Sequence, residues 1–298
     1  MLVLAPLVSI LRYSLEPIPP FTWFGLQISS LDVAAAFRLC LLLRQVREAL
    51  YKEHVSTKGH DTVEEASFVK SASTTLMVVY GGEAIVAPFL GITPSFMISG
   101  TVPTLYTIIQ AVVDYLPSVP SLSVQTELPL AFFDGIARAY LLCNIIPPVV
   151  TKNVVDDIAE SPWTLLVTSL VMANAGFFFT NLLSFLNPTP LSVQTPPELK
   201  PYGWTTVDLW CAPTITAIYS LLTHTQPFWA DLHTVIVEIL GGATSGKTVE
   251  PVDPETARVL CALLLSTLFA GRTAKNFGLL DSYFPKPKPD TKGKQKVQ

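Results

Sequence analysis

Charged side chains are scarce in this chain of 298 residues. Lys, Arg, Asp and Glu make up 14% of it, against about 25% in an average soluble domain. Half of the residues are hydrophobic, and the mean hydropathy is +0.45. This composition excludes an ordinary soluble enzyme and predicts a membrane protein.

Cysteine is scarce too, and its spacing excludes two kinds of site. The four cysteines lie one to a segment in apolar runs, with no CxxC pair and no neighbouring pair of histidines. This spacing argues against a disulfide framework and a metal site, so we expect small core residues, no metal and no other cofactor. They are Cys40, Cys143, Cys211 and Cys261.

The chain also lacks a catalytic constellation and a large net charge. Its four histidines lie in loops or at the ends of apolar runs, without partners nearby in the sequence, so we do not expect an enzyme. The formal net charge of −4 is too small to indicate a charged partner, and we expect no nucleic acid.

Seven segments are apolar and long enough to cross a bilayer, which takes about 20 helical residues. Lys and Arg gather on one side of these segments, and the positive-inside rule makes that side cytosolic. We therefore predict a luminal N-terminus and a cytosolic C-terminus. The segments are 26–43, 67–90, 96–116, 128–147, 163–186, 205–223 and 257–277.

Two short motifs recur in the same order. The stretch "FLGITP" at 89–94 returns ninety-six positions later as "FLNPTP", and the pair Pro103-Thr104 is matched by Pro213-Thr214. The repeating unit has three helices, so the second copy enters the membrane inverted, which tends to put a binding or permeation path between the copies.

We thus predict an all-α membrane protein in which a domain at 1–277 holds an inverted 3+3 helix repeat and a seventh helix. Repeat one covers about 24–117, repeat two about 127–227, and the seventh helix about 255–277. The remaining residues, 278–298, are basic and proline-rich, and we expect a disordered cytosolic tail.

Ionisable groups inside a membrane segment are costly and are functional candidates by default. Asp134 and Arg138 stand four residues apart, on one face of the fourth segment, and Asp32 and Arg38 stand in the first. Three interpretations of the pair stay open: mutual neutralisation, the lining of an aqueous path, or a lipid-phosphate contact by Arg138. Arg38 is a second candidate for lipid contact.

Glycines interrupt the second and fifth segments. In "VVYGGEAIVAPFLG", Gly81, Gly82 and Pro88 predict a kinked or unwound helix, with Glu83 attracting cations. The corresponding segment has Asn174 and Gly176. Close packing of helices is the alternative role for the glycines.

"GGATSGKT", from Gly241 to Thr248, matches the phosphate-binding pattern GxxxxGK[ST]. That mechanism needs a helix to begin at Lys247 and Thr248, but Pro251 and Pro254 follow within six residues. We expect a solvated loop and no nucleotide.

The chain resembles the trimeric intracellular cation channel family over most of 17–277. Three segments carry the resemblance, "LPLAFFDGIARAYLL", "SPWTLLVTSLVMANAGFFFTNLLSFL" and "PETARVLCALLLSTLFAGRTAKNF". Arg138 stands at the Arg of the animal KExxR motif, but Asp134 and Gly135 replace its Lys and Glu, so the resemblance is to a remote or non-animal-type member.

The resemblance implies a homotrimer in the endoplasmic reticulum membrane, with a potassium-permeable path in each protomer and membrane lipids, anionic ones included, as partners. The end "KQKVQ" resembles a dilysine retrieval signal, which agrees with this location. We expect a monovalent cation channel that supplies counter-ions for calcium release and uptake. The alternatives are a secondary transporter and a non-conducting lipid-binding scaffold.

Overall fold

A computed structural model describes residues 4–23, 25–65, 67–241 and 249–279. Within these ranges the chain is helical and contains no strand beyond an isolated bridge between Pro17 and Ser29. The expected all-α class is confirmed. The tail at 280–298 and residues 242–248 of the phosphate-loop pattern lie outside the described residues.

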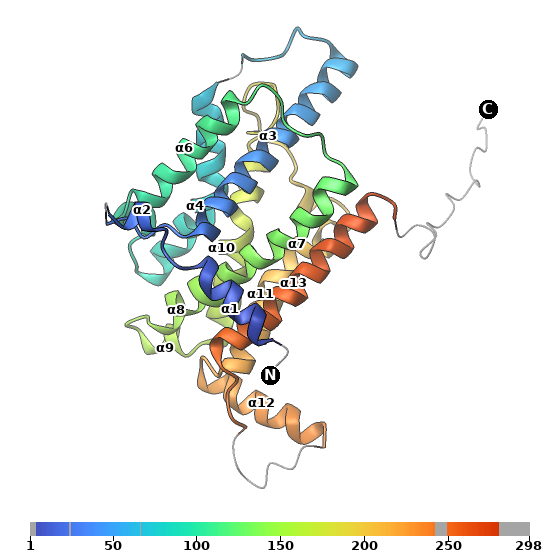
Figure 1. The fold of residues 1–298 in the computed structure, drawn as a ribbon. Coiled ribbons are helices and arrows are strands. Elements are labelled where there is room, and N and C mark those ends of the chain that lie inside the picture. The colour runs from blue at the N-terminus through green and yellow to red at the C-terminus, as the bar shows by residue number, and fades with distance from the viewer. Residues whose placement is uncertain (1–3, 24, 66, 242–248, 280–298) are drawn as a thin grey trace, which may run out of the picture.

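Long helices form the body of the molecule (Figure 1). A π-helical turn, η1 (Leu141–Ile145), and α8 (Ile146–Thr151) continue α7 without a break. The long helices are α3 (Ser30–Lys58), α4 (Phe68–Leu90), α6 (Thr101–Tyr115), α7 (Val124–Tyr140), α10 (Pro162–Leu182), α11 (Val207–Thr223) and α13 (Pro254–Asn276).

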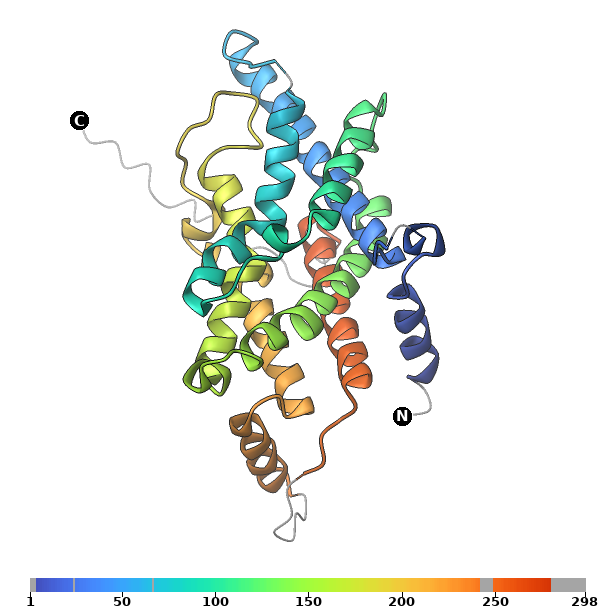
Figure 2. The same cartoon turned by 90° about the vertical axis from the view of Figure 1, so that its left-hand side faces the viewer.

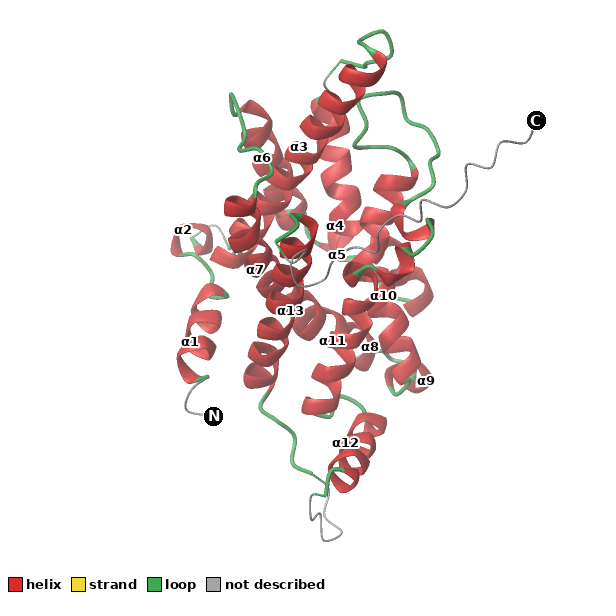
Figure 3. Ribbon diagram, turned by 90° about the vertical axis from the view of Figure 1, so that its right-hand side faces the viewer, coloured by secondary structure: helices red, strands yellow, loops and turns green. Residues whose placement is uncertain are grey.

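Shorter elements lie between and before these helices. Figure 3 shows α12 at one end of the molecule and the C-terminal part of α3 at the other. The short elements are α1 (Ala5–Ser14), α2 (Pro19–Thr22), α5 (Ser95–Ile98), α9 (Asp156–Ala159), α12 (Pro227–Ile239), and the 3-10 turns η2 (Pro197–Leu199) and η3 (Gly203–Thr205).

Among the described residues, four helices are long and apolar enough to cross a membrane, by length and composition. They are α4, α7 continued to Thr151, α10 and α13, which correspond to the second, fourth, fifth and seventh predicted segments. A fifth, α11, is apolar but shorter. The predicted third segment is split, because the chain leaves the helix at Ser99 and Gly100, and α3 is much longer than the first segment.

Local sequence explains where these helices begin and end. Ser67 and Ser161 accept hydrogen bonds from the backbone N–H groups of Lys70 and Thr164, which caps α4 and α10. Ser29 and Asp32 form a capping box at the start of α3. The side chain of Asp32, a charged residue of the first predicted segment, is thus engaged in capping α3. Gly91, with φ +64°, ends α4 in the left-handed conformation.

Two pairs of helices pack most closely, α4 with α10 and α7 with α13. Around them, α6 packs against α3 and α4, while α11 packs against α10 and α13 (Figures 1 and 2). The larger apolar cluster lies among α7, α10, α11 and α13, and a smaller one lies between α3 and α6. All four cysteines are buried and free, as expected of core residues.

Candidate functional site

The glycines of α4 and α10 lie where these two helices cross. A Cβ on Gly81 would lie 3.1 Å from Cα of Gly176, and a Cβ on Gly82 would lie 2.6 Å from Cα of Met172. A Cβ on Gly176 would lie 2.7 Å from the carbonyl carbon of Val78. The glycines therefore allow the two backbones to touch.

Both helices run unbroken through these positions, which corrects the expected unwinding. Pro88 falls in the last turn of α4, just before Gly91 ends the helix, so the backbone donor it lacks affects only that end. Close packing is the role that the geometry gives to all three glycines.

Glu83 is half-buried and is occupied in capping a short helix. Its Oε1 accepts from the backbone N–H of Ser95 at 2.6 Å, and its Oε2 accepts from the Ser95 hydroxyl at 2.8 Å. Ser95 is the first residue of α5. A local cap accounts for this charge, and the geometry gives no sign that Glu83 attracts cations.

Arg38 of α3 forms a buried cluster with two carboxylates of α7. Its Nη2 donates to Oε2 of Glu127 at 2.9 Å and to Oδ2 of Asp134 at 3.0 Å, and its Nε donates to Oδ1 of Asp134 at 3.1 Å. The exposed side-chain fractions are 8% for Arg38, 10% for Glu127 and 27% for Asp134. We refer to these three residues as the Arg38 triad.

The triad corrects two sequence interpretations. Asp134 pairs with Arg38, so the expected pair within α7, Asp134 with Arg138, does not form. Arg38 lies inside the protein against two carboxylates, so it is not placed to meet a lipid phosphate.

Sequence reasoning missed Glu127, because the predicted fourth segment starts one residue after it. A signal was present, since Glu127 precedes Asp134 by seven residues, or about two helical turns, and the two therefore share a face of α7.

Arg138 and Asn174, both sequence candidates, lie near each other between α7 and α10. Nη2 of Arg138 is 3.5 Å from Oδ1 of Asn174, which is long for a hydrogen bond. Nε of Arg138 is buried and has no partner among the described residues. The amide of Asn174 also donates to the carbonyl of Leu170 at 2.8 Å. Arg138 is thus partly buried without a carboxylate beside it in the described chain.

Buried hydroxyl groups join neighbouring helices on both sides of the α4 and α10 crossing. The Thr75 hydroxyl of α4 donates to Oε1 of Gln110 of α6 at 2.6 Å. Ser169 of α10 and Thr216 of α11 share a hydrogen bond of 2.8 Å. These bonds satisfy polar groups that would otherwise be costly in an apolar interior.

A groove of about 1070 Å³ opens between α3, α4, α6 and the segment 185–188. Lys70 fastens this segment, because its ammonium group donates to the carbonyls of Asn187 and Thr189 at 3.2 and 2.9 Å. Arg47 on the groove wall donates to Asp114 at 3.0 Å. The "FLNPTP" motif therefore forms a wall of the groove.

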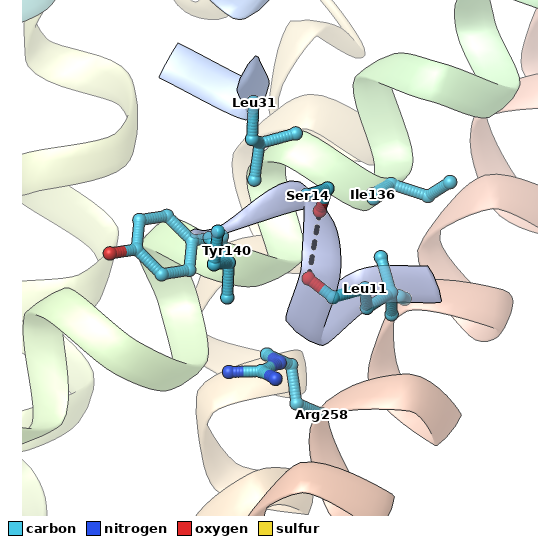
Figure 4. Close-up of a pocket in the computed structure, with 8 residues that line it drawn as sticks. Leu11, Ser14, Leu31, Ile136, Tyr140 and Arg258 are labelled. Carbon is cyan, nitrogen blue, oxygen red and sulfur yellow. Dashed lines mark hydrogen bonds between the residues drawn. The ribbon is translucent and has the colours of Figure 1, made fainter. Parts of the chain in front are cut away.

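Figure 4 shows a much smaller cavity, of about 10 Å³, between α1, α3, α7 and α13. Arg258 lines it below Tyr140, beside Leu11 and Ser14 of α1. Arg258 is buried, and its Nε has no partner among the described residues. This volume is near the minimum for one water molecule, so the cavity has no room for an organic ligand.

Two histidines that are separated in the sequence meet outside the candidate membrane helices. Nε2 of His224 lies 2.8 Å from Nδ1 of His233 on α12. Burial and the neighbouring imidazole of His233 both lower the pKa of His224 from its usual value. The pair joins the end of α11 to α12.

Comparisons with family models, with curated proteins and with solved structures found no match. A proposal about function therefore depends on the residues and their geometry, together with the sequence resemblance.

Proposed function

We propose that this protein is a potassium-permeable monovalent cation channel of the endoplasmic reticulum membrane, which supplies counter-ion flux for calcium release and uptake. Its seven membrane segments form an inverted 3+3 repeat plus one, and the path lies at the interface of the repeats. The protein assembles as a homotrimer with one path in each protomer.

The observation that carries the proposal is a pair of contacts between residues at nearly the same sequence spacing. Arg38 binds Asp134 across 96 positions, and Gly81 meets Gly176 across 95. If two halves are related by a twofold axis, a residue that touches its own counterpart lies on that axis. The first contact has the spacing of the recurring "FLGITP" motif and the second differs from it by one residue, which supports an axis passing between α3 and α7 and between α4 and α10.

The packing of the two halves supports the same symmetry. In the first half α6 packs against α4, and in the second half α11 packs against α10. A buried hydroxyl joins each of these helix pairs, Thr75 in one and Ser169 in the other. An axis in the membrane plane is the arrangement in which inverted-repeat proteins place a path at the interface of the repeats.

Two polar side chains lie close to the proposed interface. Arg138 and Asn174 lie between α7 and α10, and Arg138 has no full ion pair among the described residues. Inside a membrane such a group faces water, a ligand or a lipid headgroup. Anionic lipid at Arg138 is part of the proposal.

The proposed location and orientation depend on the sequence. Lys and Arg gather on the side of the 43–67 loop and the C-terminus, which makes that side cytosolic, and the N-terminus is luminal. The terminal "KQKVQ" is placed on the same side, where a retrieval signal is read.

Recording from purified protein in planar bilayers tests the function. We expect unitary current steps in potassium chloride that vanish when a large organic cation replaces potassium. Slow, saturable, coupled flux without steps would indicate a secondary transporter, and the absence of both would leave a lipid-binding scaffold. Arg138→Gln should change the step size, while Arg12→Gln, which removes an exposed ion pair with Glu255, is the matched control.

A further inference from the structure

Helix α12 carries a row of large apolar side chains that the rest of the described chain leaves exposed. Phe228, Val235 and Ile239 are separated by seven and four residues, so they share one face of the helix. Their exposed fractions are 47, 48 and 78%. We call these three residues the apolar row of α12. An exposed row of this kind indicates a surface that meets an apolar partner.

Polar side chains form a second stripe on the same helix. Asp231, Thr234 and Glu238 are separated by three and four residues, and they therefore share a face as well. At 3.6 residues per turn this stripe lies about a quarter of a turn from the apolar row. Asp231 and Glu238 are acidic, and α12 has no Lys or Arg. The helix is thus amphipathic, and both of its charged residues are negative.

Hydrogen bonds hold the chain on both sides of α12 at the ends of other helices. Gln226, the residue before α12, donates to the carbonyls of Ala159 and Ser161 at 2.6 and 3.2 Å, just before α10 begins. Beyond α12, the backbone N–H of Val252 donates to the carbonyl of Leu222, in the last turn of α11, at 2.7 Å. Helix α13 begins two residues later. The start of α10, the end of α11 and the start of α13 therefore surround α12.

These helix ends indicate the depth at which α12 lies. Both α10 and α13 are long and apolar enough to cross a membrane, and both begin at the end of the molecule that holds α12 (Figure 3). Trp163, the second residue of α10, is 74% exposed. Exposed tryptophan at the end of a membrane helix is typical of the membrane–water interface. Helix α12 has 13 residues, which is too short to cross the bilayer itself.

We propose that α12 lies in the plane of the membrane on the bilayer surface, with its apolar row among the first carbons of the acyl chains. Interfacial helices of this kind bury the apolar face by about 5–10 Å, and the acidic stripe faces water. Because its charges are negative, α12 gains nothing from anionic lipid, so its partner is the zwitterionic phospholipid surface. The inference depends on α10 and α13 crossing the membrane and is independent of ion conduction.

Fluorescent probes on α12 test this placement. The full chain is reconstituted in phosphatidylcholine vesicles, and a polarity-sensitive thiol probe is attached to Ile239→Cys, Val235→Cys or, as the matched control on the acidic stripe, Asp231→Cys. The four native cysteines are buried, so the unsubstituted protein gives the labelling background. We expect phosphatidylcholine brominated on its acyl chains to quench the probes at positions 239 and 235, and iodide in the water to quench the probe at position 231.

The depths of the two probes on the apolar row show how the helix lies. Equal depths at positions 235 and 239, about 5–10 Å below the phosphates, are expected of a helix in the membrane plane. A probe at position 239 that is shallower than the one at 235, or that iodide quenches, overturns the proposal. A probe that neither quencher reaches is covered by protein, such as a second copy of the chain, and overturns it too. Leu240→Cys, at an 80% exposed position, replaces a Val235→Cys protein that does not fold.

Lipid composition tests the proposed partner. Replacing part of the phosphatidylcholine with phosphatidylserine, or raising the salt concentration, should leave the probe depths unchanged, and insertion that requires anionic lipid overturns the assignment to a zwitterionic surface. Recording in bilayers separates this inference from the proposed function. Protein that inserts α12 as expected but does not conduct refutes only the channel, whereas conducting protein whose probe at position 239 lies in water refutes only the placement of α12.

Discussion

The crossing of α4 and α10 allows a sharp test of the packing. We expect Gly176→Ala to destabilise the protein, because the new methyl group would lie 2.7 Å from the carbonyl carbon of Val78, where ordinary contact begins at 3.4 Å. The carbonyl oxygen of Val78 would lie closer still, so the two helices would have to separate by more than about 0.7 Å, and forcing a methyl group into a filled space costs about 1–3 kcal/mol.

Gly271 provides the matched control. It lies within α13, and a Cβ there would meet nothing within 4 Å. Alanine forms helix better than glycine, so Gly271→Ala should stabilise the protein by about 0.5–1 kcal/mol. The two substitutions add the same methyl group to a helix and are expected to act in opposite directions.

The measurement is the thermal midpoint of each purified variant in the same detergent, read by tryptophan fluorescence and by the monodisperse fraction on gel filtration. A Gly176→Ala protein as stable as Gly271→Ala would refute the close crossing. It would also remove the contact between Gly81 and Gly176 from the support for a twofold axis.

Three further predictions concern polar groups. Arg38→Gln leaves two carboxylates without the Arg38 guanidinium and should lower the free energy of unfolding by about 3–5 kcal/mol, measured by thermal unfolding. Adding Asp134→Asn should recover part of this loss, and no recovery would contradict the triad. Thr75→Val leaves Oε1 of Gln110 buried without its donor and should cost about 1–3 kcal/mol by the same assay, whereas an unchanged midpoint would speak against this bond. The lowered pKa of His224 contributes stability that is present above its ordinary value of 6.5 and is lost as the pH falls through the lower value of the folded protein. The midpoint should therefore fall between about pH 7 and pH 5, and less so in His233→Ala; an equal fall in both proteins would contradict the coupling.

Sequence predicted some helices closely because their ends are encoded locally. The second and fifth predicted segments begin within one residue of α4 and α10, where Ser67 and Ser161 provide the caps. The first segment was too short by fifteen residues at its C-terminal end, because α3 carries charged residues from Arg44 onward and hydropathy alone does not detect that part of the helix. That helix continues to Lys58 and ends at Gly59, with φ +76°.

The site was harder to predict, because a helical pattern shows which residues share a face but not which helix lies opposite. Asp134 had an available partner four residues away in Arg138, and the structure instead places Arg38 of another helix against it. Likewise, the sequence left open whether Gly81 and Gly82 break α4 or pack it, and only the position of α10 decides between the two. Equal spacing was the one usable signal, since Arg38 and Asp134 are separated by 96 positions, as are the two motifs.

Two charged residues of α7 have opposite signs, and each has a buried atom without a partner among the described residues. Glu127, with its unpaired Oε1, begins α7, and Arg138, with its unpaired Nε, follows eleven residues later, or about 16 Å along the helix axis. Under the proposed function, a cation attracted by Glu127 would have to pass a positive group three turns further along. Glu127 would therefore concentrate cations at one end of α7, while Arg138 would limit their passage unless an anionic lipid neutralises it. An attracting group and a barrier on one helix would make conduction sensitive to any motion of α7 against α3.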